Sequence, residues 1–312
     1  MPLSISDAVE QSADVAATKA RQARSVSRYM TSSALAGGYI GVAVVLLVSV
    51  SAPVVAAGSP FAKLVQGSVF GIALTLVVFA GAELFTGNNM FMLQGLFSGK
   101  VRASDVAAVW SVSLVGNLVG SVGFAALVHG AGTLGASTAG TPPAGERLVA
   151  SIVETKNAAA GPQLFWRAVL CNLLVCLGLW MAARATSDGA KLVVVWWALL
   201  AFIASGFEHS VANMTLFSLG VFEGSAAWAD LARNLLWTVP GNIVGGGVLV
   251  GVVYTYLADR PAAARVDAAS HPAAADDTEI PEANAAHLPR QSRNGAADRA
   301  ALSPAEVARL NP

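Results

Sequence analysis

AELFTGNN at residues 82–89 and FEHSVANM at residues 207–214 each place polar residues inside a long apolar segment. The two segments, about 64–97 and 191–222, exceed the roughly 20 residues that a helix needs to cross a bilayer. A continuous helix of that length, rising about 1.5 Å per residue, would overshoot the hydrocarbon layer of about 30 Å. We therefore predict two helices that break within the membrane.

Four further apolar segments complete a pattern of six spans in an all-α membrane protein. They lie at about 34–57, 105–131, 163–184 and 231–257. The composition agrees, because 55% of residues are hydrophobic and 12% are charged, against about a quarter charged in soluble domains. The 19 basic and 19 acidic residues balance, and no basic stretch is interleaved with aromatic residues, so we exclude nucleic acid as a partner.

The two ends of the chain differ from this transmembrane region, residues 31–258. Residues 1–30 are polar and charged, with a pattern that predicts an amphipathic helix on the cytoplasmic face and no cleavable signal peptide. Residues 259–312 are rich in Ala, Pro, Asp and Arg, which predicts a disordered cytoplasmic tail. Basic residues are concentrated on the flanks that include both ends, and this places both termini in the cytoplasm.

The chain matches itself at a shift of 125 residues. The polar residues that recur are Glu83 and Glu208, Asn88 and Asn213, and Asn117 and Asn242. Each copy, about 34–131 and 159–257, contains three spans, so the second copy enters the membrane from the opposite side. Inverted repeats with paired broken helices are typical of transporters, and the half-helix N-termini favour anions near the midplane. We predict a small anion as the solute, or an acid that travels with its proton.

His209 is the one histidine of four that falls within a predicted break. An ionisable residue at membrane depth is by default a pathway residue, and the matching position in the first repeat is the apolar Leu84. We therefore prefer a role in transport to a structural hydrogen bond. Asn172 and Thr86 lack a repeat counterpart of the same type, and we predict that they line the pore.

Glu83 and Glu208 lie where the broken helices restart, and we expect each carboxylate to cap the exposed N–H groups of a half-helix. Glu208 has a second possible partner, because Lys156 in the loop before the fourth span could reach it. Otherwise Lys156 is a solvated loop charge, or it concentrates anions at the pore mouth. Asn117 and Asn242 are flanked by glycines, and we expect them to hold neighbouring helices together.

The sequence offers little material for an enzyme, a metal site or a cofactor. Cys171 and Cys176 lie five residues apart in one apolar run without CxxC spacing, and we interpret them as packing residues. A single midplane histidine has no second His or Cys beside it to form a metal site or a nucleophile with its base. A neutral-solute channel of the aquaporin type would share the inverted repeats, but NPA motifs are absent from the breaks.

Four sequence motifs follow one another along the predicted spans. They are GAELFTG at 81–87, LCNLLVCLGLWMA at 170–182, ASGFEHSVANM at 204–214 and GNIVGG at 241–246. Together they resemble the formate/nitrite transporter family, over about residues 29–258, and look most similar to its nitrite-channel branch. The resemblance implies an aquaporin-like fold in the bacterial cytoplasmic membrane, assembled as a homopentamer with one pore in each protomer.

The resemblance also implies a pore with a vestibule at each side and two hydrophobic constrictions around a central histidine. By position, the central histidine is His209, its polar neighbours are Asn172 and Thr86, and Leu84 is the tip of the first break. The constriction residues are Phe70, Leu74 and Phe202, and the vestibule pair is Lys156 with Glu208. We expect passive or proton-coupled passage of nitrite, with formate and hydrosulfide as alternatives and His209 donating a hydrogen bond or a proton.

Overall fold

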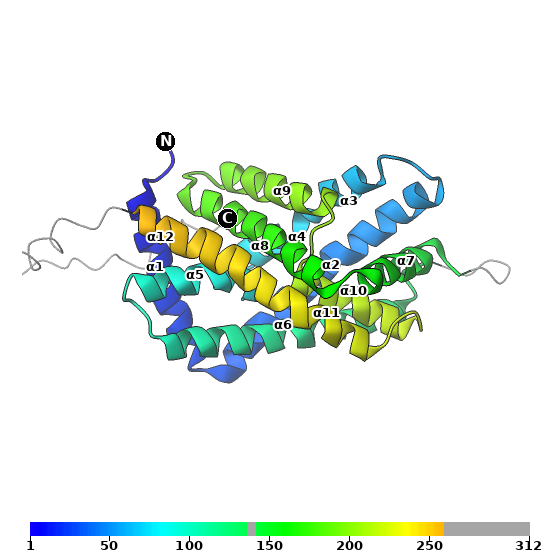
Figure 1. The fold of residues 1–312 in the computed structure, drawn as a ribbon, viewed down its shortest axis with the longest axis horizontal. Helices are drawn as coiled ribbons and strands as arrows, with labels where there is room; N and C mark the ends of the chain where they lie inside the picture. The colour runs from blue at the N-terminus through cyan, green and yellow to red at the C-terminus, as the bar shows by residue number, and fades with distance from the viewer. Residues whose placement is uncertain (136–141, 259–312) are drawn as a thin grey trace, which may run out of the picture. The chain divides into compact units, whose positions relative to one another are not determined.

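The structure is a computed structural model, and it describes residues 1–135 and 142–258. Over these residues the chain forms helices and turns and no strand, which confirms the all-α prediction (Figure 1). The predicted tail, residues 259–312, lies outside the described residues. Among the described residues, five helical stretches are long and apolar enough to cross a membrane, and a shorter apolar helix spans Ser210–Phe222.

The first half of the chain supplies six helices. They are α1 (Ile5–Ala23), α2 (Val26–Ala56), α3 (Ala62–Phe70), α4 (Ile72–Phe79), α5 (Phe85–Phe97) and α6 (Ala103–Ala131). The second half supplies α7 (Ala144–Ala158), α8 (Gly161–Arg184), α9 (Asp188–Ala204), α10 (Ser210–Phe222), α11 (Trp228–Asn242), the π-helix η1 (Ile243–Val252) and α12 (Val253–Leu257). Two of these were not predicted, namely the short amphipathic α7 and the π-helical winding of η1.

Both broken segments break at equivalent glycines. After α4 the chain turns at Gly81, which has a φ of 78°, and after α9 it turns at Gly206, which has a φ of 71°. This left-handed conformation is accessible to glycine because it has no Cβ. The residues directly before the half-helices, Leu84 and His209, are both extended, and α5 and α10 begin immediately after them.

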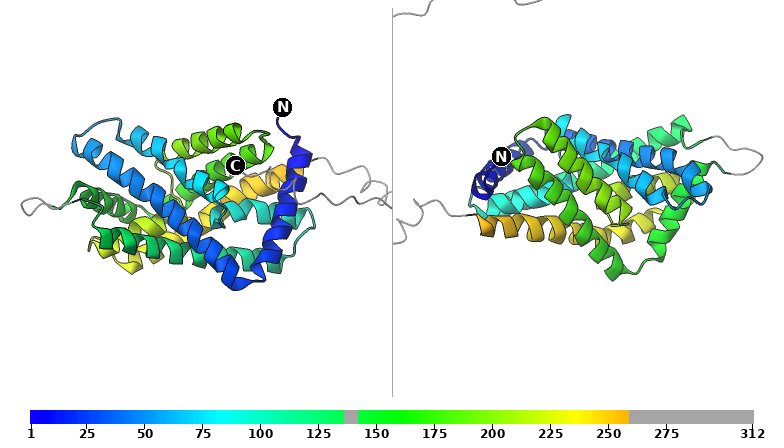
Figure 2. Two further views of the ribbon diagram at one scale, coloured as in Figure 1. Left: turned by 180° about the vertical axis from the view of Figure 1, so that it is seen from behind. Right: turned by 90° about the horizontal axis from the view of Figure 1, so that it is seen from above.

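α1 folds back onto the transmembrane helices through a face of small residues. Its buried residues are Ala8, Val9, Ser12, Ala13, Ala16 and Ala23. This face packs against α5, and α1 also contacts α12 in the views of Figures 1 and 2. Two hydrogen bonds of 2.9 Å join the backbone of Leu3 to Arg184, so the start of α1 is fastened to the end of α8.

Glycines allow helices to pack closely where they cross one another. A Cβ at Gly120 would overlap with the backbone of Ala34, where α6 crosses α2, and a Cβ at Gly245 would overlap with the backbone of Val169, where η1 crosses α8. Small residues are typical of such contacts in membranes, where apolar burial against lipid provides little net attraction between helices.

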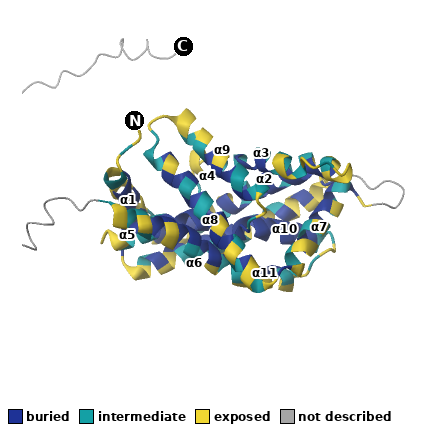
Figure 3. Cartoon of the chain, turned by 45° about the horizontal axis from the view of Figure 1, so that its top comes forward, coloured by how far each residue is buried: buried dark blue, intermediate teal, exposed yellow. Residues whose placement is uncertain are grey.

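Large apolar side chains remain exposed on the outward faces of the helices. Those on α9 and α11 include Trp196, Trp197, Trp228 and Leu236. α10, in contrast, is buried over nearly its whole length (Figure 3). Exposed apolar surface of this kind marks contact with a membrane or with another subunit.

Candidate functional site

A small cavity of about 10 Å³ lies beside His209. The other residues that line it are Ile40, Phe70, Ala73, Leu74, Leu84, Val175, Leu199 and Phe202. His209 is therefore the one polar residue among the described residues that line this cavity. A site of this size holds about one water molecule, so the cavity excludes bulk water from the histidine.

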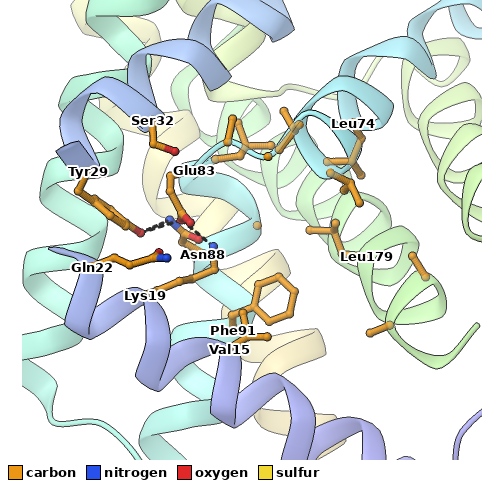
Figure 4. Close-up of a pocket in the computed structure, with 18 of the residues that line it drawn as sticks. Val15, Lys19, Gln22, Tyr29, Ser32, Leu74, Glu83, Asn88, Phe91 and Leu179 are labelled. Atoms are coloured by element: carbon orange, nitrogen blue, oxygen red, sulfur yellow. Dashed lines mark hydrogen bonds and ion pairs between the residues drawn. The ribbon is translucent and has the colours of Figure 1, made fainter. Parts of the chain in front are cut away.

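A much larger pocket of about 1050 Å³, here called the vestibule, adjoins the cavity on the side of α1 (Figure 4). Leu74 and Leu84 line both spaces, so these two side chains stand between the vestibule and the cavity. The charged residues that line the vestibule are Lys19, Arg21, Arg28, Lys191 and Glu83. The excess of positive charge favours the entry of anions.

His209 is held through both nitrogens of its ring. Nδ1 accepts a hydrogen bond from the Ala212 N–H at 3.1 Å, so the histidine side chain caps α10. Because Nδ1 is an acceptor, a neutral ring carries its hydrogen on Nε2, and Nε2 then donates to Thr86 Oγ1 at 3.0 Å. The ring also stacks against Phe202, with the centroids 5.9 Å apart. The structure thus fixes both the orientation of the ring and its tautomer.

Asn172 lies behind Thr86 rather than on the cavity wall. Its Nδ2 donates to the backbone oxygens of Thr86 at 3.1 Å and Asn242 at 2.7 Å. Neither Asn172 nor Thr86 is among the described residues that line the cavity, although both are fully buried. That their side chains line the pore stays a prediction. Thr86 contacts His209, and Asn172 contacts the backbone of Thr86.

The two glutamates at the breaks pair with lysines. Lys19 Nζ lies 2.6 Å from Glu83 Oε2, and Lys156 Nζ lies 2.7 Å from Glu208 Oε2. The expectation that these carboxylates cap the half-helices was wrong, because their hydrogen bonds within the described residues go to side chains. Of the alternatives for Lys156, the structure places it against Glu208, where 12% of its side chain is exposed.

Asparagine side chains, and not carboxylates, accept hydrogen bonds from the backbone N–H groups at the starts of the half-helices. Asn117 Oδ1 accepts from the Phe85 N–H at 2.8 Å, and Asn242 Oδ1 accepts from the Ser210 N–H at 3.0 Å. Each asparagine also donates to the carbonyl of the glutamate two residues before the half-helix, at 2.9 Å and 3.1 Å. These bonds bridge the break itself and are equivalent at the shift of 125 residues.

The remaining repeat-related asparagines have different partners. Asn213 Nδ2 donates to Glu208 Oε2 at 2.7 Å and to Asn234 Oδ1 at 2.8 Å. Asn88 Nδ2 donates to the hydroxyl of Tyr29 at 3.2 Å, and this hydroxyl donates to Glu83 Oε2 at 2.7 Å (Figure 4). The first break therefore uses a tyrosine, and among the described residues no tyrosine takes the equivalent place at the second.

Sequence reasoning did not identify Lys19, Tyr29 or Asn234 as part of this site. Lys19 belongs to a helix that looks like a surface segment, and its polar face gives no sign of the partner that it meets. Within residues 1–135 and 142–258, no group of three or more His, Cys, Asp and Glu side chains is arranged to hold a metal ion.

The sequence profile of the formate/nitrite transporter family matches residues 6–256. The chain belongs to this family. The resemblance stated from the four motifs is thereby confirmed, and the family match covers all the residues of the cavity and the vestibule. The tail after residue 258 lies beyond it.

Relatives and solved structures agree with the family assignment. The nitrite transporter NirC of Salmonella typhimurium is 42% identical over 247 residues, covering 77% of this chain and 87% of the relative. A solved FNT family ion channel superposes with a TM-score of 0.74 at 40% identity, covering 81% of this chain and 99% of that chain. A pentameric formate channel with formate bound superposes with a TM-score of 0.63 at 27% identity, covering 75% and 98%.

Proposed function

We propose that this protein is a channel that moves nitrite across the bacterial cytoplasmic membrane, and that it is not an enzyme. Family membership and the similarity to NirC support transport of a small monovalent anion. The observation that carries the proposal is the cavity beside His209, where a single polar group faces an otherwise apolar wall. Such a site resists a bare ion and favours a small solute that accepts one hydrogen bond.

The chain crosses the membrane six times, as two inverted repeats at about 34–131 and 159–257 within a channel domain of residues 31–258. The equivalent glycine turns and asparagine bridges at a shift of 125 residues support this arrangement. Both termini lie in the cytoplasm, and residues 1–30 lie on that face. Membrane lipid surrounds five protomers, and the similarity to a pentameric channel supports this number.

The path runs from the vestibule to His209 and on toward Lys156. Leu74 and Leu84 form the constriction on the vestibule side, and Phe70 and Phe202, whose rings meet edge to face at 5.7 Å, form the constriction beyond the histidine. Placing a charge at the centre of a bilayer costs about 2.5–3.5 kcal/mol even on insertion scales. The excess of cations that line the vestibule offsets part of this cost on that side, because it attracts anions to the constriction.

His209 supplies the hydrogen bond at the centre. In the resting geometry Nε2–H donates to Thr86, and as nitrite passes, the same N–H turns from the hydroxyl to a nitrite oxygen. Thr86 then keeps its hydroxyl as a second donor or acceptor for the solute. Nitrite travels passively or together with a proton, and in the second case the imidazole is the group at the centre that can deliver it.

Formate is the second candidate solute, and a specific observation supports it. The pentameric channel of similar fold was solved with formate bound, and formate has the same charge and nearly the same shape as nitrite. Hydrosulfide differs in shape but not in charge. A neutral solute such as glycerol belongs to another functional class, for which the excess of cations in the vestibule offers no advantage.

The test is a comparison of nitrite, formate, hydrosulfide and glycerol fluxes into vesicles that contain the purified protein, at two pH values. We expect nitrite to be fastest, formate to follow and glycerol to enter no faster than into protein-free vesicles. Formate faster than nitrite would favour the second candidate. Glycerol permeation above that of protein-free vesicles, or no anion flux at all, would contradict the anion channel.

A further inference from the structure

Two side chains of α8 meet the first turn of the half-helix α5. Asn172 Nδ2 donates to the Thr86 backbone oxygen at 3.1 Å, and the Cys176 Sγ lies 3.4 Å from the same oxygen. Sγ also lies 3.7 Å from Asn172 Oδ1. Because Nδ2 faces two carbonyl oxygens, the orientation of the amide is unambiguous, and Oδ1 must point toward the thiol.

Cys176 is therefore more than a packing residue. Within the described part of the chain, its thiol is the hydrogen-bond partner of Asn172 Oδ1, and both residues are fully buried. The thiol has one hydrogen and two acceptors within reach. The Thr86 oxygen also accepts from Asn172 Nδ2, whereas Asn172 Oδ1 has no other donor in the described part of the chain. The thiol thus completes the hydrogen bonding of the Asn172 side chain, which would otherwise leave a buried acceptor without a partner.

Gly246 closes this cluster from the third side. It lies in the first turn of η1 and is buried, and a Cβ at this position would overlap with both Asn172 Nδ2 and Cys176 Sγ. Asn242, four residues earlier in the same motif, provides the second carbonyl for the amide at 2.7 Å. Asn172 of α8 is thus bonded both to α5 and to the last residue of α11, and Gly246 of η1 leaves the space for this contact directly behind Thr86.

We propose that Cys176, Asn172 and Gly246 form a positioning unit that holds Thr86 at hydrogen-bond distance from His209. None of the three lines the cavity, so the unit acts through Thr86 and not on the solute. The distance that it controls is the 3.0 Å between Thr86 Oγ1 and His209 Nε2. By controlling this distance, the unit determines how readily the Nε2–H exchanges its hydrogen bond to the Thr86 hydroxyl for one to a passing anion. This part of the inference rests on the proposed function.

Cys176→Ala, Cys176→Ser and the matched control Cys171→Ala test this unit. Cys171 is equally buried on the same helix, but no hydrogen bond to α5 or η1 is found for it among the described residues. We expect Cys176→Ala to lower nitrite flux about fivefold, the effect of one lost buried hydrogen bond, and to change the nitrite-to-formate flux ratio. Serine can donate to Oδ1, so Cys176→Ser should recover most of the flux, and Cys171→Ala should match the unaltered protein.

A second readout does not depend on flux. In protein with ¹⁵N-labelled histidine and with His129, His271 and His287 replaced by glutamine, the ring nitrogens of His209 report its tautomer by solid-state NMR. We expect a protonated Nε2 and an acceptor Nδ1, and a shifted Nε2 signal in Cys176→Ala but not in Cys171→Ala. Equal behaviour of the two alanine variants in both measurements would overturn the positioning unit. No anion flux in any protein, with the NMR difference present, would overturn only the proposed function.

Discussion

The two breaks share a set of stabilising contacts, here called the frame, but differ in the residue directly before the half-helix, here called the tip. In both, a left-handed glycine turns the chain, a buried asparagine bridges the gap, and a glutamate pairs with a lysine from another helix. The residue that precedes the half-helix is Leu84 at the first break and His209 at the second. The shared parts stabilise an interrupted helix, and the unshared part is the one to which we assign the chemistry under the proposed function.

The surroundings of the two breaks differ as well. Glu83 lines the wide vestibule, where 12% of its side chain is exposed, whereas the side chain of Glu208 is 4% exposed. The lysine partners also come from different places, because Lys19 belongs to the docked helix α1 and Lys156 belongs to α7. The same ion pair is therefore more hydrated at the first break than at the second.

The largest expected effect comes from removing one lysine. Lys156→Met leaves the Glu208 carboxylate without its cation in a buried site, which costs about 3–5 kcal/mol of stability. Lys19→Met should cost less, because water in the vestibule reaches Glu83. The measurement is the free energy of unfolding in mixed detergent micelles with increasing SDS.

A double variant serves as the control for this prediction. Lys156→Met combined with Glu208→Gln removes the unpaired charge, so most of the lost stability should return. If Lys156→Met and Lys19→Met lowered the free energy of unfolding equally, the two ion pairs would be equally hydrated. That result would contradict the inference from the different exposure of Glu83 and Glu208.

Removing the bridging asparagines should show that the frame is the same at both breaks. Asn117→Ala and Asn242→Ala each remove three hydrogen bonds, and each should cost about 3 kcal/mol in the same unfolding measurement. Asn242→Asp should cost at least as much as Asn242→Ala, because it would place a buried carboxylate against the backbone oxygens of Ala168 and Glu208. A loss at one break and not at the other would contradict the equivalence of the two bridges.

Much of this frame could be predicted from the sequence, because long apolar segments, and polar residues inside them, are strong signals in a membrane protein. Apolar length indicated the spans, and Glu and Asn at a constant shift indicated the paired breaks. The direction of a side chain on an apolar helix gives no such signal, so the contact of Asn172 with the Thr86 backbone could not be predicted. Likewise, α7 is too polar to be read as a span, and the contact of Lys19 depends on how α1 folds back.

His209→Leu makes the tip of the second break resemble that of the first. We expect nitrite flux to fall about tenfold or more, because the one polar group that faces the cavity is lost, a change of about 1.4 kcal/mol in the barrier per factor of ten. The remaining flux should also lose its dependence on pH. Flux is measured in vesicles, with His129→Gln as the control because His129 pairs with Glu223 away from the cavity. An unchanged pH profile in His209→Leu would refute the role of the imidazole.

The smallest effect is expected from removing the Tyr29 hydroxyl, which contributes hydrogen bonds at the first break. Tyr29→Phe removes the donor to Glu83 at 2.7 Å and the acceptor for Asn88 at 3.2 Å, but it keeps the buried ring. We expect a loss of about 1 kcal/mol in stability, because Lys19 still neutralises the carboxylate and water in the vestibule can replace the hydroxyl. Tyr39→Phe is the control, since no hydrogen bond of its hydroxyl is found among the described residues. A loss near that of Lys156→Met would mean that the tyrosine, and not the lysine, holds Glu83, and the two breaks would then differ in their frames as well as in their tips.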